Sequence, residues 1–253
     1  MGKDTTVVCC SLLGLLLLAS GAMTAHAAEF TISPLRIGLD RENRTSQFEI
    51  RNGAQQPLRL QLQAMSWTQD AKGEDHYSES DGLMFFPKAL EIPAGESRII
   101  RLGVKAVPVT QEDTYRLYVE ELPGPVQPAA PGARVRVSLR IGVPVFVAPL
   151  TPKPEAEIRS LEALGGAARL AIANTGNVTL AADRVELVGW ARDGRQLFSK
   201  PLSDRYFLAG VTKQIDTDIP RELCPQTAAL EAVVDAEPLR LQRRVDVTPA
   251  SCR

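Results

Sequence analysis

The sequence predicts an all-β fold of two β-sandwich domains joined by a proline-rich elbow. Short segments with alternating apolar and polar residues recur along the chain with turn residues between them, and no convincing long amphipathic helix is present. The proline-rich stretch Leu150–Pro154 divides these segments into two sets, as a stiff linker would. Short strands at this spacing are typical of sandwiches rather than of parallel sheets.

The N-terminus has the features of a secretory signal. Lys3 lies in a short polar start, Leu12–Leu18 is almost purely apolar, and residues 25–27 (Ala-His-Ala) fit a cleavage site. The apolar run is too short to span a bilayer in the mature protein. We therefore expect cleavage after this site and an exported mature chain without membrane insertion. The expected units are a signal peptide and two domains, at residues 1–27, 28–149 and 150–253.

The segments before the elbow are expected to form about seven strands. Their boundaries follow turn and loop signals: Asn52-Gly53 is a turn pair, and Gln69–Gly82 and Pro123–Gly132 have the acidic or Pro/Gly/Ala-rich composition of loops. The expected strands are Phe30–Ile32, Gln47–Ile50, Leu58–Trp67, Ala89–Ile92, Arg98–Val104, Tyr115–Leu122 and Ala133–Val147.

The segments after the elbow are expected to form the second sandwich. Cys224 and Cys252 are the cysteines left after removal of the signal, and an even pair in an oxidising compartment predicts a disulfide between them. The alternative is two independent free thiols. The expected strands are Ala168–Ala173, Arg184–Trp190, Gln196–Phe198, Thr212–Ile215, Ala228–Val234 and Leu239–Val247.

The most unusual of these segments is Ala133–Val147. Its odd positions are all apolar, whereas its even positions up to Arg140 are polar, which is the period of a strand with one dry and one wet face. At ~3.3 Å per residue the run would be ~50 Å long, far beyond the usual strand of about five or six residues. We therefore expect part of its apolar face to serve something other than its own domain.

The charge balance and the residue types argue against nucleic-acid binding and against catalysis. The formal net charge is −1, and basic residues are concentrated only locally, at residues 134–140. His76 is the only histidine outside the signal, and one histidine cannot build a typical zinc site. The acids around it lack the spacing of a calcium loop, so we expect a solvated acidic loop without a metal. We expect no enzyme activity and no cofactor.

Several pieces of the sequence occur in an order and spacing that chance rarely produces. They are Ile32–Ile37 with its basic residue, Asn52 followed by Pro57 and Trp67, the block Phe86–Leu102, the segment Tyr115–Pro123, the long alternating run, and the turn Asn174–Val178. Together they resemble the PapD-like periplasmic chaperones of the chaperone–usher pilus pathway. The resemblance implies two immunoglobulin-like (Ig-like) β-sandwich domains. The run Arg140–Val147 resembles the archaic branch of the family, which includes chaperones of spore-coat-U-like pilins.

The resemblance implies a mechanism of strand donation. A pilus subunit is an incomplete Ig-like fold whose missing strand leaves an apolar groove, and the chaperone lends its own strand to fill it. The residues implied to enter the groove are Val135, Val137, Leu139 and Ile141. The alternative is that these residues fill the core of their own domain, as we expect for Val143, Val145 and Val147.

The resemblance also implies an anion site. Arg36 matches the cleft arginine that binds the subunit's C-terminal carboxylate in relatives, a role that suits a guanidinium group. Relatives pair this arginine with a lysine, but Pro144 stands at that position here. The nearby cations are Arg140, Arg136 and Arg101, and we expect Arg140 to share the anchor with Arg36. The alternative is a different form of anchoring.

These inferences predict a periplasmic chaperone that is not an enzyme. Its partners would be pilin subunits and an outer-membrane usher, and an exposed apolar edge also invites self-capping by a second copy of the free chain. The alternative is an exported two-domain Ig-like structural or adhesive protein without chaperone activity. The long strand distinguishes the two, because only a chaperone needs its apolar face outside its own core.

Overall fold

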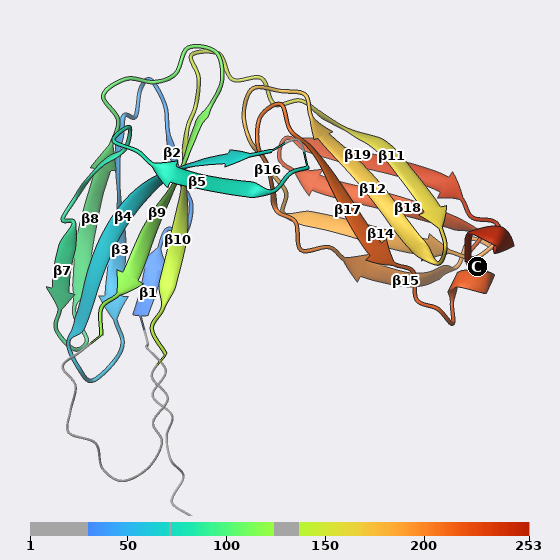
Figure 1. The fold of residues 1–253 in the computed structure, drawn as a ribbon, viewed down its shortest axis with the longest axis horizontal. Helices are drawn as coiled ribbons and strands as arrows, with labels where there is room; N and C mark the ends of the chain where they lie inside the picture. The colour runs from blue at the N-terminus through green and yellow to red at the C-terminus, as the bar shows by residue number, and fades with distance from the viewer. Residues whose placement is uncertain (1–29, 71, 124–136, 253) are drawn as a thin grey trace, which may run out of the picture.

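The computed structural model describes residues 30–70, 72–123 and 137–252, which form two all-β domains that meet at an elbow (Figure 1). These residues contain no α-helix, only the short 3-10 helices η1 (Cys224–Gln226) and η2 (Pro249–Cys252). No helix in the described part of the chain is long and apolar enough to cross a membrane. The expectation of an all-β protein is confirmed.

The first domain is a sandwich of two sheets. One sheet has four strands in the order β1 (Phe30–Ser33), β3 (Thr45–Asn52), β8 (Ser97–Gly103) and β6 (Met84–Phe86). The other has six strands. Its order is β2 (Ile37–Leu39), β10 (Arg140–Val147), β9 (Asp113–Glu121), β4 (Leu58–Gln69) and β5 (Asp75–Glu79), with β7 (Ala89–Ile92) also paired to β4. In this sheet β2 and β10 are parallel, and the other pairs are antiparallel.

Alternation in the sequence decides which face of each strand is buried. In β4 every second residue from Leu58 to Ala64 is buried, and the residues between them are exposed. In β10, Val143, Val145 and Val147 are 0% exposed, which confirms that this end of the long segment belongs to the core. Burial of these apolar faces between the two sheets is the main source of stability of the domain.

The expectation of one strand over residues 133–147 is wrong in the part that the structure describes. The strand β10 begins at Arg140, and Val137–Leu139 lie outside any strand. Its neighbour β9 ends at Glu121, and Pro123 has no N–H with which to extend the ladder. The long segment therefore loses its partner strand before its apolar pattern ends.

The expectation that Gln69–Gly82 is only a loop is also wrong, because the segment contains β5. All five residues of β5 are exposed, so burial leaves no alternating pattern in the sequence. The strand is held instead by its pairing with β4, from Met65↔Glu79 to Gln69↔Asp75. The short strands β2 and β6 were likewise not expected.

The second domain is built from three sheets around its own core. The first contains β11 (Ala156–Leu164), β12 (Ala167–Asn174) and β17 (Thr212–Asp218). A two-stranded sheet contains β13 (Leu180–Ala181) and β16 (Tyr206–Phe207). The third has the order β15 (Gln196–Pro201), β14 (Arg184–Trp190), β18 (Ala229–Ala236) and β19 (Leu239–Asp246). The strand β11 was not expected from the sequence.

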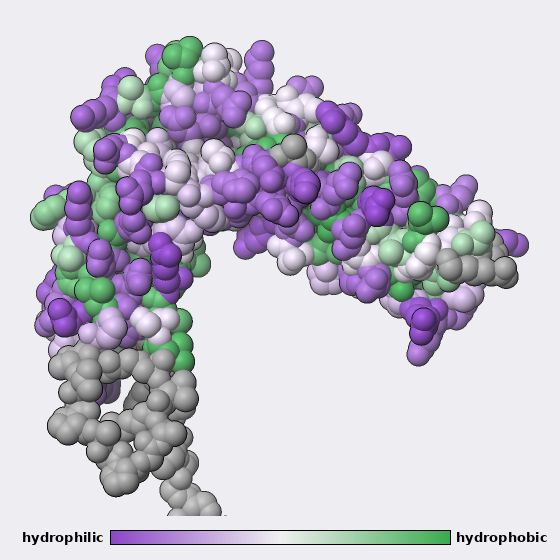
Figure 2. All heavy atoms as spheres, viewed as in Figure 1, coloured by the Kyte–Doolittle hydropathy of each residue, from purple (hydrophilic) through white to green (hydrophobic). Residues whose placement is uncertain are grey.

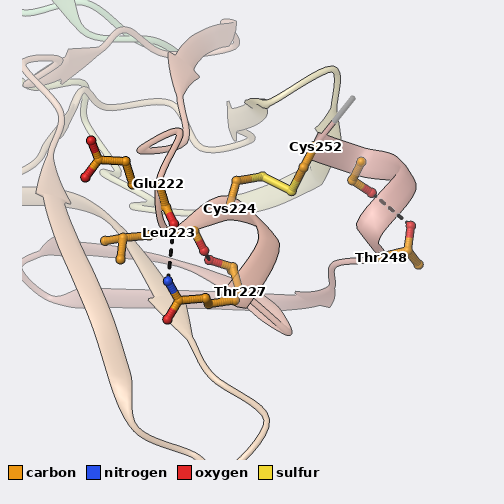
Figure 3. The surroundings of a disulfide bond; sticks show 8 residues. Glu222, Leu223, Cys224, Thr227, Thr248 and Cys252 are labelled. Atoms are coloured by element: carbon orange, nitrogen blue, oxygen red, sulfur yellow. Dashed lines mark hydrogen bonds between the residues drawn. A yellow bond between two sulfur atoms is a disulfide. The ribbon is translucent and has the colours of Figure 1, made fainter.

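A disulfide closes the far end of the second domain. Cys224 and Cys252 are bonded, with their Cα atoms 5.8 Å apart, and the bond joins η1 to η2 (Figure 3). Cys224 is buried, and Cys252 packs against the same core. The predicted disulfide is confirmed, and the alternative of two free thiols is wrong.

Candidate functional site

The strand β10 is paired on both sides over only part of its length. On one side β9 pairs with β10 from end to end. On the other side β2 pairs only with Val145–Val147. Within the described residues, the backbone of Arg140–Pro144 therefore has a free edge. Such an edge carries unpaired N–H and C=O groups and is a template for pairing with another chain.

The apolar residues expected to enter a partner become more exposed before β10 begins. Ile141 is half-buried and packs against the core, Leu139 is half-buried, and Val137 is 68% exposed. Val135 lies outside the described residues. Figure 2 shows a hydrophobic area at this end of the first domain. Ile141 thus contributes partly to its own core, whereas Val137 does not.

Two arginines flank Pro144 on the outward face of the six-stranded sheet. Pro144 is paired in register with Arg116 of β9. On its other side β2 runs parallel with Ile37 opposite Val145, so Arg36, which precedes β2, flanks Pro144. Arg36 is exposed. Pro144 itself is buried and carries no charge, so the two arginines are the cations nearest to it in this register.

Arg116, one of the two arginines that flank Pro144, was not among the cations expected from the sequence. Its guanidinium carbon lies 3.9 Å from the ring centroid of Trp67 and 5.3 Å from that of Tyr206 in the second domain, both within cation–π range. One of its Nη atoms donates a hydrogen bond to the carbonyl of Gly142 at 3.4 Å. The alternation of apolar and polar residues predicts that the Arg116 side chain lies on the outward face of its strand. Only the pairing register shows that it lies beside Pro144.

Arg140 lies further along the same face. It is four residues from Pro144, which corresponds to ~13 Å along a strand. Its Nε is 3.6 Å from a Glu120 carboxylate oxygen, and its guanidinium carbon is 4.0 Å from the Tyr118 ring centroid. In the register between β9 and β10, Arg116 rather than Arg140 lies opposite Pro144. Arg101 lies in the other sheet, on β8, and Arg136 is outside the described residues.

The acidic segment around His76 shows no metal centre in the described part of the chain. The exposed His76 ring lies 3.3 Å from a carboxylate oxygen of Asp70. Hydrogen bonds from the backbone N–H groups of Glu74 and Lys72 lower the pKa of Asp70. No group of three or more His, Cys, Asp or Glu residues within the described ranges is arranged to hold a metal ion.

The fold and this edge define a class of protein: two Ig-like sandwiches, the first of which presents a partly unpaired strand. The family described as pili and flagellar-assembly chaperones, PapD N-terminal domain, matches residues 29–153. Residues 29–153 therefore form an N-terminal domain of the PapD-like family of pilus chaperones. No protein of curated function matches the sequence.

Solved structures of pilus chaperones share the fold. A structure of the CsuC–CsuE chaperone–tip adhesion subunit complex, from archaic chaperone–usher Csu pili of Acinetobacter baumannii, matches with a TM-score of 0.58 and 19% identity over 87% of this chain and 100% of that chain. The Salmonella enterica SafA pilin–SafB chaperone complex gives 0.58 and 13% over 87% and 98%. The Pseudomonas aeruginosa CupB2 chaperone gives 0.54 and 15% over 86% and 100%. These matches confirm the expected two-domain Ig-like fold.

Proposed function

We propose that this protein is a periplasmic chaperone that holds pilus subunits by donor-strand complementation and delivers them to an outer-membrane usher. The observation that carries the proposal is the free edge of β10, preceded by the exposed Val137. A free edge with exposed apolar side chains favours aggregation unless a partner covers it. An incomplete sandwich that lacks one strand has the complementary defect.

Strand donation divides the work between the backbone and the side chains. The edge of Arg140–Pro144 would pair with the subunit's backbone, which gives affinity for many sequences. Val135, Val137, Leu139 and Ile141 follow the same period of two and would enter the groove of the subunit. Each such side chain contributes about 1.5–3 kcal/mol on full burial, offset by the cost of ordering the segment.

The C-terminal carboxylate of the subunit would bind Arg36 together with a second cation. We proposed Arg140 from the sequence, and the register supports Arg116 as a second candidate because it flanks Pro144 from the other side. A guanidinium group binds a carboxylate through two parallel hydrogen bonds, which fixes the register of the inserted strand. Arg36→Ala should sharply reduce the yield of subunit without changing the fold. Arg116→Ala and Arg140→Ala then identify its partner by which of them reproduces that loss.

The remaining parts of the proposal follow from the family. Residues 1–27 would be a signal peptide, and the domains would span residues 28–149 and 150–253. The chain would act without catalysis, metal or cofactor, and a second copy would cap the free edge when no subunit is bound. The sequence of β10 and the likeness of the fold to a chaperone of an archaic pathway support the archaic branch.

A matched pair of exposed valines tests the proposal. Val137, which precedes the free edge of β10 in the chain, is 68% exposed. Val109, in a loop that precedes β9, is 70% exposed. The tagged protein is expressed in the periplasm with the pilin-like secreted proteins encoded beside its gene. Val137→Glu should stay folded and lose the subunit, because a charge cannot enter an apolar groove, whereas Val109→Glu should retain it.

Either of two results would overturn the proposal. One is recovery of free protein only, with the candidate subunits soluble in its absence; this result favours a structural or adhesive Ig-like protein. The other is unfolding of Val137→Glu with Val109→Glu intact, which would make the segment part of its own core. Delivery to the usher is tested by surface pili, which should disappear on deletion of the gene and return with the wild type but not with Val137→Glu.

A further inference from the structure

The hairpin formed by β4 and β5 extends from the first domain to the second, where β5 lies beside β16 (Figure 1). The last residue of β4, Gln69, makes the contact. Its Oε1 accepts the backbone N–H of Leu208 at 2.9 Å, and its Nε2 donates to the backbone carbonyl of Tyr206 at 3.1 Å. One amide side chain thus satisfies a donor and an acceptor on the backbone of the other domain, as a neighbouring strand would.

An apolar cluster lies beside this amide. Trp67 of β4 and Phe146 of β10 pack with Leu208 of the second domain, and the three residues are 1%, 9% and 5% exposed. The Trp67 and Tyr206 rings meet edge to face with centroids 5.5 Å apart. Figure 2 shows the outer surface of the hairpin as hydrophilic, so the apolar cluster is buried beneath a polar surface. Arg116 closes one side by stacking over both rings.

The turn of the hairpin also fits the second domain closely. Gly73 has a φ of 80°, and a Cβ added there would lie 2.4 Å from the Lys213 side chain of β17. Lys213 is held in place by Asp204, whose carboxylate oxygen is 2.6 Å from Nζ. Asp75, at the start of β5, accepts a hydrogen bond from the Gln69 amide at 2.9 Å. A side chain larger than glycine would push the hairpin away from β17.

A second contact lies near the linker between the domains. A Glu112 carboxylate oxygen accepts the backbone N–H of Thr179 at 2.8 Å, and the Asn177 amide donates to the carbonyls of Thr110 and Thr151 at 2.8 and 3.0 Å. The two domains are therefore joined at the hairpin as well as at the linker. Two domains joined by a linker alone are expected to move relative to each other.

We infer that Gln69, at the base of the β4–β5 hairpin, is a positioning residue that fixes the angle between the two domains and holds Tyr206 over Arg116. The inference goes beyond the proposed function and holds whatever partner the first domain binds. It assigns a role to a hairpin whose exposed strand has no part in the core of its own domain.

The test measures the distance between the domains. Spin labels on cysteines at Glu49 of β3 and Gln242 of β19, both exposed, report it by pulsed electron spin resonance in the full mature chain. The wild type should give one narrow distribution. Gln69→Ala and Gln69→Glu should broaden this distribution. The ratio of molecules with other interdomain distances to molecules with the wild-type distance should rise about tenfold. Glutamate keeps the length of the side chain and the oxygen that accepts the Leu208 N–H, but it replaces the donor to the Tyr206 carbonyl with a second oxygen. If Gln69 acted only by packing, Gln69→Glu would therefore leave the distance distribution unchanged.

Two control variants separate the loss of the Gln69 hydrogen bonds to the second domain from other consequences of the substitutions. Gln63→Ala removes an amide from the same face of β4 without a contact to the second domain, and should keep the narrow distribution. Gln69→Glu combined with Asp75→Asn removes the like-charge pair inside the hairpin and should remain broad. A broad wild-type distribution would overturn the inference. So would narrow distributions for both Gln69 variants with both domains folded by circular dichroism, or a return to the wild-type distribution in the double variant.

Discussion

The turn after β3 in the first domain and the turn after β12 in the second are held by the same arrangement of a buried asparagine. Asn52 and Asn174, 0% and 2% exposed, each end their strand. Each donates to the carbonyl four residues later and to a distant carbonyl, that of Ile92 in the first domain and Phe207 in the second. Each also accepts the N–H of the residue two positions on. The two sandwiches thus share a turn as well as a fold.

The domains differ in how they treat their edges. In the second domain the edge strand β19 carries exposed arginines, which discourage pairing with another chain, and the disulfide fixes the chain that follows it. In the first domain the edge of Arg140–Pro144 is free in the described residues and is preceded by an exposed valine. We therefore call the first domain open, because one of its edges is free to pair with another chain, and the second closed, because exposed charges oppose such pairing along β19.

The largest effect is expected from opening the closed domain. Cys224→Ala with Cys252→Ala removes a bond between residues 28 positions apart and should cost about 3–4 kcal/mol by loop entropy. Native-state hydrogen exchange should show the loss in β12 and β18 and not in β4 and β9. Ser251→Ala is the control beside the bond. An equal loss in both domains would mean that they unfold as one unit and would contradict the comparison.

Replacement of either shared asparagine should destabilise the protein somewhat less than loss of the disulfide, and only in the domain that contains the asparagine. Asn52→Leu removes the partner of the buried Ile92 carbonyl and of three further, part-buried backbone groups, at a cost of about 2–3 kcal/mol. Asn174→Leu should cost the same in the second domain only. Hydrogen exchange measured strand by strand distinguishes the two. The exposed Asn43→Ala should change little, and an equally small effect of Asn52→Leu would show that the shared turn is not a source of stability.

The fold was largely predictable from the sequence, and the reason is burial. Strands with one buried face, such as Leu58–Gln69, leave a period of two in the sequence, and a cysteine pair in an exported chain indicates a disulfide. The exposed β5 leaves no such period, because its partner strand rather than the core holds it. Pairing between distant strands cannot be read from the local pattern of one of them.

The candidate site was predictable only in part, for the same reason. The alternation from Val137 to Val147 gave the apolar face, but not the point at which the strand loses its partner. Arg36 was proposed through a resemblance to a family motif. Arg116 was missed because its place beside Pro144 depends on the register between β9 and β10, and its contact with Tyr206 depends on the second domain. Neither follows from spacing along the chain.

The two ends of the long segment allow a smaller and sharper test. Val143→Ala removes two methyl groups from a fully buried side chain and should destabilise the first domain by about 1–2 kcal/mol. Val137→Ala, at a position that is 68% exposed, should lie within about 0.5 kcal/mol of the wild type. Urea unfolding of the free protein measures both. A cost for Val137→Ala as large as for Val143→Ala would place the whole segment in the core and remove the contrast between an open and a closed domain.

The smallest effect concerns Glu112, which accepts the Thr179 N–H across the elbow. Burial raises the pKa of the Glu112 carboxyl above its ordinary 4.5, and the nearby Asp113 charge adds to this, although hydrogen bonds from Thr179 act in the opposite direction. The folded protein therefore holds this proton more tightly than the unfolded chain. The resulting contribution to stability is fully present below pH 4.5 and is lost as the pH rises through the raised pKa.

Glu112→Gln should remove this dependence while its amide oxygen still accepts the Thr179 N–H. The variant should be more stable than the wild type at pH 7, by no more than about 1 kcal/mol, and the difference should vanish as the pH falls below 4.5. Urea unfolding as a function of pH measures it, with the exposed Glu91→Gln as the control. A variant that loses stability at pH 7 would show that the ionised carboxylate strengthens the junction. The charge of Glu112 would then help to hold the open and closed domains together.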